Sequence, residues 1–227
     1  MKNFTLFPVL YLIIALVELY SEITSERALH LASKPLLVLL VGVIFLTSTR
    51  GSNHPAKKFV LWGLLFSWFG DVLLMFKQEF SGSFVSGLGA FLIAHIFYII
   101  AYRQGSGGKF TLSYFVFVPI IGYGVVLFSV LAPYLGTMLL PVAIYSIVLL
   151  GMLVAALERG GRTSQESFWW VVAGAVCFVG SDSILAWHSF VEPSVVARVS
   201  LMALYIAAQY AIARGMALHI SNDVKPR

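Results

Sequence analysis

The chain has 227 residues, of which 59% are hydrophobic and only 11% are charged. Soluble domains carry about 25% charged residues, and disordered chains combine low hydrophobicity with high charge, so this composition argues against both classes. A single cysteine, Cys177, excludes an internal disulfide and a cysteine-rich metal site. The net charge of +5 is typical of the cytoplasmic loops of a membrane protein, and we expect no nucleic-acid partner.

Eight apolar segments follow one another, each near the ~20 residues that a helix needs to cross a bilayer. The second begins at Ser33-Lys34-Pro35, and a serine cap with proline in the first turn predicts a helix start there. No loop is long enough for a separate domain. We therefore predict an all-α polytopic membrane bundle of eight transmembrane helices in one domain, residues 1–227. The segments are 4–20, 33–48, 59–76, 84–102, 111–131, 137–156, 167–187 and 195–214.

The basic residues divide unevenly between the two sets of loops, eleven on one side and four on the other. By the positive-inside rule the richer side faces the cytoplasm, together with both termini. The prediction is a multi-pass integral membrane protein, placed in the inner membrane if the cell is bacterial. The four basic residues on the opposite, outer side are Arg27, Lys34, Lys77 and Arg198.

The third and seventh segments align on their aspartates, Gly70-Asp71 over Ser181-Asp182. The following segments also align, Ala94-His95 over Ala208-Gln209. A parallel duplication of four helices, with repeats 1–103 and 109–214, would produce this pattern. Chance similarity between two apolar helices explains it equally well.

Asp71 and Asp182 each interrupt an otherwise uncharged span. An aspartate at the middle of a span costs about 2.5–3.5 kcal/mol on insertion scales, and such residues usually face the bundle interior and mark function. Asp71 is six residues before Lys77 and Asp182 is six before His188. Both therefore lie about 9 Å below the outer boundary, at matching depth. The alternative is a packing contact in which each carboxylate bonds to the Ser67 or Ser181 hydroxyl.

Further polar side chains fall at or near this depth. Each could serve in a functional site, but each could also have a purely structural role. Lys34 and Arg198 suit a lipid phosphate but could be snorkelling cations at the interface. His95 is near mid-membrane and could only bridge two helices. Glu18 could be a solvated helix end. The tyrosines and the glutamine could line a polar cavity or pack between helices: Tyr98, Tyr145, Tyr205 and Gln209.

Taken in order, these motifs resemble those of the YhhN-like lysoplasmalogenase family of eight-span membrane proteins. The resemblance covers nearly the whole chain, and its specificity lies in the set rather than in one motif. The matching motifs are Lys34-Pro35, Phe66-Ser67-x-x-Gly70-Asp71-x-Leu73-Leu74, Gly89-x-Phe91-x-x-Ala94-His95-x-x-Tyr98, Ser181-Asp182-Ser183 and Tyr205-x-x-Ala208-Gln209.

The resemblance implies hydrolysis of the sn-1 vinyl ether of lysoplasmalogens to a fatty aldehyde and glycerophosphocholine or glycerophosphoethanolamine. This reaction needs one carboxylic acid to protonate the vinyl ether, and a negative group beside the resulting oxocarbenium ion. Paired carboxylates divide such roles in glycosidases. We expect Asp71 and Asp182 to be this pair, with His95, Tyr205 and Gln209 in support. Lys34 or Arg198 would then hold the phosphate, and Glu18 an ammonium headgroup.

Two other classes of function remain open at this point. A proton-coupled transporter also uses carboxylates within its spans. A metal-dependent lipid hydrolase could recruit His30, His95 and His188, although so few histidines make a poor zinc site. A non-catalytic membrane protein would leave the two matched aspartates unexplained. We expect no cofactor or metal, a lysophospholipid substrate and a bilayer environment; the oligomeric state is open.

Overall fold

The computed structural model describes residues 6–77, 79–80, 82–105 and 114–223, and within these ranges all regular structure is helical. One short 3-10 helix, η1 (Gly136–Met138), stands between the fifth and sixth long helices. The long helices are α1 (Leu6–Thr24), α2 (Arg27–Ser48), α3 (Ala56–Met75), α4 (Ser83–Arg103), α5 (Tyr114–Leu135), α6 (Leu139–Leu157), α7 (Gln165–Phe190) and α8 (Val195–Asp223).

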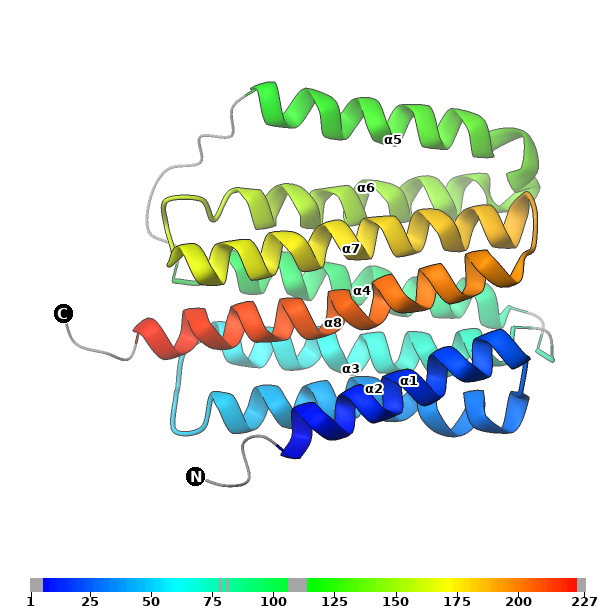
Figure 1. Ribbon diagram of the computed structural model, residues 1–227. Coiled ribbons are helices and arrows are strands. Elements are labelled where there is room, and N and C mark those ends of the chain that lie inside the picture. Colours follow the sequence, from blue (N-terminus) through cyan, green and yellow to red (C-terminus); the bar gives the residue numbers. More distant parts are fainter. Residues whose placement is uncertain (1–5, 78, 81, 106–113, 224–227) are drawn as a thin grey trace.

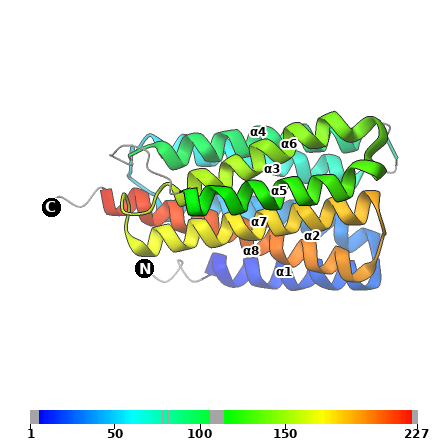
Figure 2. The ribbon, with the colours of Figure 1, turned by 90° about the horizontal axis from the view of Figure 1, so that it is seen from above.

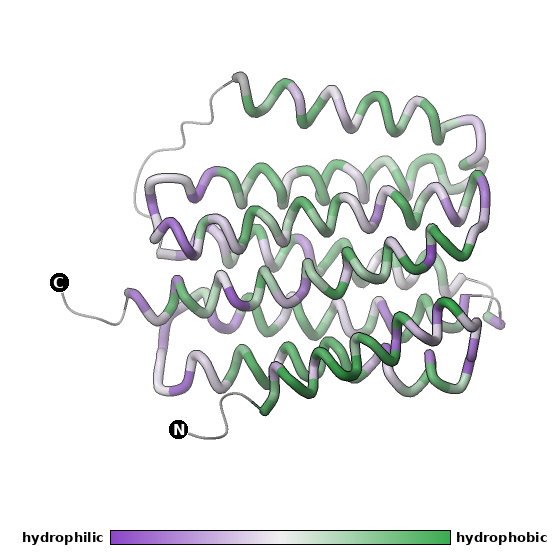
Figure 3. The backbone as a smooth tube through the Cα atoms, viewed as in Figure 1, coloured by the Kyte–Doolittle hydropathy of each residue, from purple (hydrophilic) through white to green (hydrophobic). Residues whose placement is uncertain are grey.

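Seven helical stretches of the described chain are long and apolar enough to cross a membrane. The fifth of these, Val116–Leu157, is 42 residues long and contains most of α5, η1 and all of α6. Apolar residues follow the lengths of the helices, whereas hydrophilic residues gather mainly at the two ends of the bundle (Figure 3). The chain is therefore an all-helical protein whose helices suit a bilayer.

The helices run along one common direction, with α5 at one edge of the bundle and α1 and α2 at the other (Figures 1 and 2). α1 begins and α8 ends at the same end of the bundle, which we call the termini end. The turns from α1 to α2, from α3 to α4 and from α7 to α8 lie at the other end, the pocket end. α2 packs against α3 and α8, and α6 packs against α7 and α4.

Two helix pairs, α3 with α4 and α7 with α8, pack most closely, and glycines permit this approach. A Cβ atom on Gly63 would lie 2.4 Å from the Tyr98 ring, and one on Gly70 would lie 2.5 Å from the Phe91 ring. A Cβ on Gly174 would lie 2.9 Å from the backbone nitrogen of Ile212. Each aspartate-bearing helix is thus fixed against its own neighbour, α3 by α4 and α7 by α8.

The predicted start of the second helix at Ser33 is wrong. α2 begins at Arg27, with Glu26 as its N-cap residue, and Pro35 lies inside the helix. The extra turns stay helical because their polar side chains bond to α1: the Ser33 hydroxyl donates to Glu18 Oε2 at 2.6 Å. Tertiary contacts therefore outweigh both the local start signal and the cost of a proline inside the helix.

Candidate active site

Asp71 is buried in the bundle and ends a chain of hydrogen bonds. Tyr98 donates to Gln209 Oε1 at 2.9 Å, and Gln209 Nε2 donates to the Tyr205 hydroxyl at 3.0 Å. Tyr205 in turn donates to Asp71 Oδ2 at 2.6 Å. The chain joins α4, α8 and α3, and it brings together four residues that the sequence singled out. Every donor in it is oriented toward Asp71, whose oxygen is the final acceptor.

Asp182 has its own tyrosine. The Tyr145 hydroxyl, from α6, donates to Asp182 Oδ2. The two aspartates share no hydrogen bond, but their carboxyl groups lie close enough to interact electrostatically. The structure thus places both carboxyl groups in one region, each held by a phenol from a helix other than its own.

A polar pocket of about 370 Å³ opens at the pocket end, above the two aspartates. Leu74 and Leu185 line it, and each is three residues beyond an aspartate on the same helix. Asp71 and Asp182 therefore lie about one helical turn, ~4.5 Å along the axis, below these leucines. The other lining residues are mostly charged or polar: Ser21, Glu22, Ser25, Glu26, Arg27, His30, Lys34, Met75, Lys77, His188, Arg198 and Leu201.

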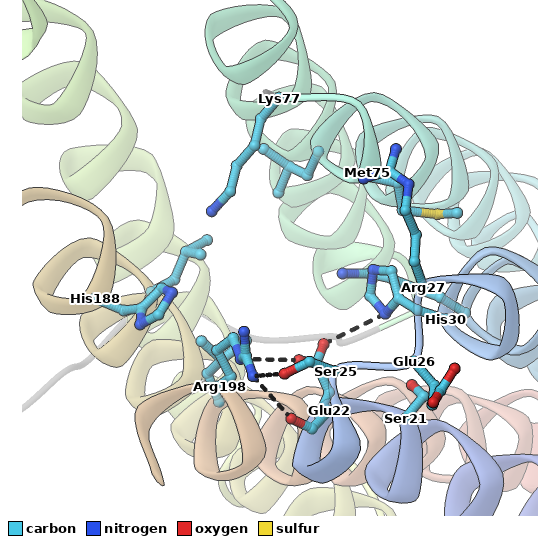
Figure 4. Close-up of a pocket in the computed structure, with 14 residues that line it drawn as sticks. Ser21, Glu22, Ser25, Glu26, Arg27, His30, Met75, Lys77, His188 and Arg198 are labelled. Carbon is cyan, nitrogen blue, oxygen red and sulfur yellow. Dashed lines mark hydrogen bonds and ion pairs between the residues drawn. The ribbon is translucent and has the colours of Figure 1, made fainter. Parts of the chain in front are cut away.

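Arg198 is fixed to the end of α1 at the wall of the polar pocket (Figure 4). Its Nη2 donates to the Glu22 carbonyl at 3.0 Å and to the Ser25 hydroxyl at 2.7 Å. Its Nε lies 3.5 Å from Glu22 Oε2. Arg198 therefore already has a carboxylate partner, unlike a snorkelling side chain.

Glu18 is fully buried and does not line the polar pocket. It accepts the Ser33 hydroxyl, and its Oε1 lies 2.9 Å from His30 Nδ1. These contacts join α1 to α2, so the interpretation of Glu18 as a solvated helix end is wrong. The geometry does not bring Glu18 to a headgroup in the pocket.

A second, mainly apolar pocket of about 50 Å³ starts beside Asp182. Asp182, Tyr145 and Ser183 give it one polar wall, and Leu185 belongs to both pockets. The two pockets thus meet at Leu185, and Asp182 lies in the wall of the apolar one. Its remaining lining comes from α4, α5, α6 and α7: Phe84, Leu88, Leu127, Leu131, Val142, Ser146, Leu149, Ala186 and Phe190.

His95 is fully buried between two aromatic rings, with centroid distances of 5.4 Å to Tyr145 and 4.7 Å to Phe178. Neither ring nitrogen has a hydrogen-bond partner within the described part of the chain. An unmet buried polar group costs roughly 1–3 kcal/mol, which packing alone would avoid with an apolar residue. His95 thus contacts the ring whose hydroxyl holds Asp182.

The two serines do not hold the aspartates. Ser181 donates to the Leu201 carbonyl at 2.9 Å and so joins α7 to α8. Ser67 is fully buried one turn before Asp71 on α3. No hydrogen bond between either serine and Asp71 or Asp182 is found in the described ranges, because tyrosines occupy that place.

One group of potential metal ligands occurs among the described residues, formed by Glu18, Glu22 and His30 with ligand atoms within 4.8 Å of one another. These ligands already contact Ser33 and Arg198. His30 and His188 line the polar pocket, but His95 lies in the core. The histidines that the metal-hydrolase interpretation needs are therefore not gathered at one point.

The sequence analysis missed the pocket roles of Arg27, Lys77 and His188. A signal for them was present: all four basic residues assigned to the outer loops line the polar pocket. Tyr145 was named only as one of several cavity candidates, although it holds Asp182. Nothing in the sequence ties it to that carboxyl group.

The model of the YhhN family matches residues 29–216, which contain every site residue discussed here except Glu18, Ser21, Glu22, Ser25, Glu26 and Arg27. The chain belongs to the YhhN family. Among its relatives, lysoplasmalogenase TMEM86B of Homo sapiens is 31% identical over 78% of this chain and 70% of its own length. The TMEM86B protein of Sus scrofa is 31% identical over 84% of this chain and 76% of its own length.

A bacterial relative is similar to nearly the same degree. The lysoplasmalogenase of Mycobacterium tuberculosis (strain CDC 1551 / Oshkosh) is 29% identical over 86% of this chain and 73% of its own length. No solved structure matches the chain. The family resemblance found in the sequence motifs is thereby confirmed.

Proposed function

We propose that this YhhN-family protein is a membrane lysoplasmalogenase, which hydrolyses the sn-1 vinyl ether of a lysoplasmalogen. The observation that carries the proposal is the position of the two carboxyl groups, both about one turn below a polar pocket, with Asp182 also lining an apolar one. Similarity over most of the chain to relatives named lysoplasmalogenase supports it. A single-chain lipid has a polar head and one apolar tail, which matches the two adjoining pockets.

The substrate would lie across Leu185, which the two pockets share. Its phosphate and headgroup would occupy the polar pocket, and the first carbons of its alkenyl chain would enter the apolar one. The vinyl ether would then lie beside Asp182, since that residue lines the apolar pocket. Asp71 lies deeper, with only 2% of its surface exposed.

The chemistry follows from these positions. The Asp182 carboxyl group donates a proton to the β-carbon of the vinyl ether, which leaves an oxocarbenium ion between the ether oxygen and the α-carbon. Water from the polar pocket adds to the α-carbon as Asp71 accepts its proton. The hemiacetal hydroxyl then gives its proton to Asp182 while Asp71 gives its proton to the glycerol oxygen; the bond to that oxygen breaks, which releases the fatty aldehyde and the free sn-1 hydroxyl and restores both carboxyl groups. Paired carboxylates serve oxocarbenium-like transition states in the same way in glycosidases.

The test is the release of fatty aldehyde from a lysoplasmalogen by purified protein in detergent. Asp71→Asn and Asp182→Asn should each lower kcat at least about a hundredfold, because general acid or base catalysis contributes typically 10²–10⁴-fold. The matched control is Glu166→Gln, which neutralises an exposed carboxylate at the other end of α7. Full activity in both folded aspartate variants would exclude the carboxylate pair. A carrier would show transport only in sealed vesicles and no turnover in detergent.

We also propose that α5 and α6 each cross the bilayer, so that the chain has eight spans in one membrane domain. Gly136, with a φ of +51°, lies in η1 where the chain reverses between them. By the positive-inside rule, the basic residues of the termini end support a cytoplasmic position for that end and for both termini. The residues that line the polar pocket lie at the opposite end of the bundle.

A duplication with repeats 1–103 and 109–214 accounts for the packing of the two halves. α3 packs on α4 as α7 packs on α8, and α2 contacts α8 as α6 contacts α4. Asp71 and Asp182 occupy equivalent helices of the two halves. We propose that the carboxyl pair arose by this doubling of one aspartate-bearing helix.

A further inference from the structure

The polar pocket holds more positive charge than its own carboxylates neutralise. Of its four lysine and arginine residues, Arg27 pairs with Glu79 and Arg198 pairs with Glu22. Lys34 and Lys77 form no ion pair or hydrogen bond with any residue that the structure describes. Two lysines, from α2 and from the end of α3, therefore enter the pocket without a direct ion-pair partner in the described chain, although Glu18 and Glu22 interact with them electrostatically.

The two lysines lie close enough to repel each other. Loss of hydration in the pocket, followed by the charge of Lys34, lowers the pKa of the Lys77 ammonium. Arg198 and His188 stand on the same side of the pocket, with the Lys77 amine directed toward His188 (Figure 4). An anion between the two ammonium groups would relieve this repulsion and restore their hydrogen bonds.

We propose that Lys34 and Lys77 form the phosphate subsite of the substrate, and that Arg198 instead fixes the pocket wall through Glu22. This inference rests on the proposed function and extends it to recognition of the lipid phosphate. The ligand class is a phosphodiester monoanion carried on a glycerol backbone. Lys34 links the subsite to the reaction, because it lines the pocket and interacts electrostatically with Asp71.

Binding of the phosphate would fix the position of the lipid along the site. A phosphate held by Lys34 and Lys77 at the pocket leaves the glycerol backbone to cross Leu74 and Leu185 to the carboxyl pair. A lipid with the same alkenyl chain but no phosphate lacks that anchor. The enzyme should therefore select phosphate-bearing alkenyl lipids over neutral ones.

The experiment compares two substrates that share the alkenyl chain and glycerol but differ in the phosphate-bearing headgroup: a 1-alkenyl-glycerophosphoethanolamine and the corresponding 1-alkenylglycerol. Lys34→Gln and Lys77→Gln should each lower kcat/KM for the phospholipid about tenfold or more, as expected for a lost charge-assisted hydrogen bond. For Lys77→Gln, turnover of the neutral lipid should stay within about twofold; Lys34→Gln should also affect the neutral lipid, because Lys34 interacts electrostatically with Asp71. Lys58→Gln is the matched control, because Lys58 is exposed at the termini end. Lys77→Arg, which keeps the charge, should retain most phospholipid turnover.

A binding measurement separates this proposal from the proposed function. The saturated 1-alkyl-glycerophosphoethanolamine cannot be hydrolysed, and it should raise the Tm of the wild-type protein but not of Lys77→Gln. Loss of that shift only in the lysine variants supports the subsite even if no lipid is turned over. Equal losses on both substrates in Lys77→Gln, or unchanged binding in both lysine variants, would overturn it. Protection by inorganic phosphate but not by the alkyl lipid would assign the subsite to free anions and also overturn it.

Discussion

Two phenol groups define the candidate site at the scale of single residues. Tyr205 and Tyr145 each bring a hydroxyl from a neighbouring helix to an aspartate. A buried carboxyl group without such a donor is costly, because water is absent from the membrane interior. The tyrosines therefore orient the two carboxyl groups as well as satisfy them.

Tyr205→Phe should separate the role of the hydroxyl in orienting Asp71 from the role of the ring in packing. It removes only the hydroxyl that joins Gln209 to Asp71, so we expect destabilisation of about 1–3 kcal/mol and a larger fall in kcat than in 1/KM. Tyr11→Phe is the control: that buried hydroxyl donates to the Ile206 carbonyl at 2.7 Å rather than to an aspartate. Thermal melting and aldehyde release are the two measurements. Equal kcat in the two variants would remove Tyr205 from the mechanism.

His95 gives a second prediction at this scale. His95→Phe fills similar space and removes two ring nitrogens that have no partner in the described chain. We expect the Tm to stay level or rise, because an unmet buried polar group is unfavourable. The kcat should fall at least about tenfold if the imidazole binds the attacking water, within the range for general acid–base groups. A raised Tm with full activity would reduce His95 to a packing residue.

The sequence singled out both aspartates and named Tyr205 as a supporting residue, but it did not connect Tyr145 with Asp182, for a physical reason. An aspartate within an apolar span is conspicuous because of its insertion cost. A tyrosine is not, because it serves equally well in packing, and only the rotation of α6 directs Tyr145 at Asp182. The serines next in sequence were the natural candidates, and Ser181 instead bonds across to α8.

At the scale of helices, close pairing of α7 with α8 holds Asp182 and Tyr205 in their relative positions. The glycine at 174 leaves no room for a methyl group against the Ile212 backbone. The sequence predicted the existence of these helices well, because apolar length is a strong signal. It predicted the start of α2 poorly, because the bonds of Ser33 and His30 to Glu18 come from the fold and not from local propensity.

Gly174→Ala should therefore destabilise the protein, because α7 and α8 must move apart to admit the methyl group. We expect a lower Tm and lower activity together. Gly42→Ala is the matched control on α2, where nothing lies within 4 Å of an added Cβ. There the better helix propensity of alanine should leave the Tm equal or higher. Thermal melting in one detergent compares the two variants directly, and an equal fall in both would argue against close packing as the cause.

At the scale of the whole molecule, the path of the chain decides where the site can meet its substrate. The stretch Val116–Leu157 is apolar throughout its 42 residues, and it can be counted as one span or as two. Its inner turn at η1 favours two, since α5 and α6 lie side by side and both run along the bundle (Figure 1). The parity of the count then fixes whether the two termini share a side.

A reporter fusion tests this parity. With eight spans and the proposed cytoplasmic termini, a fluorescent protein should fold and fluoresce at either terminus. Alkaline phosphatase should be inactive at both positions but active when inserted in the turn between α7 and α8. Seven spans would instead give opposite results at the two termini. The eight-span outcome would place Lys34, Lys77 and both carboxyl groups near the outer leaflet. The lysophospholipid would then have to enter from that leaflet, and its phosphate would reach the polar pocket first.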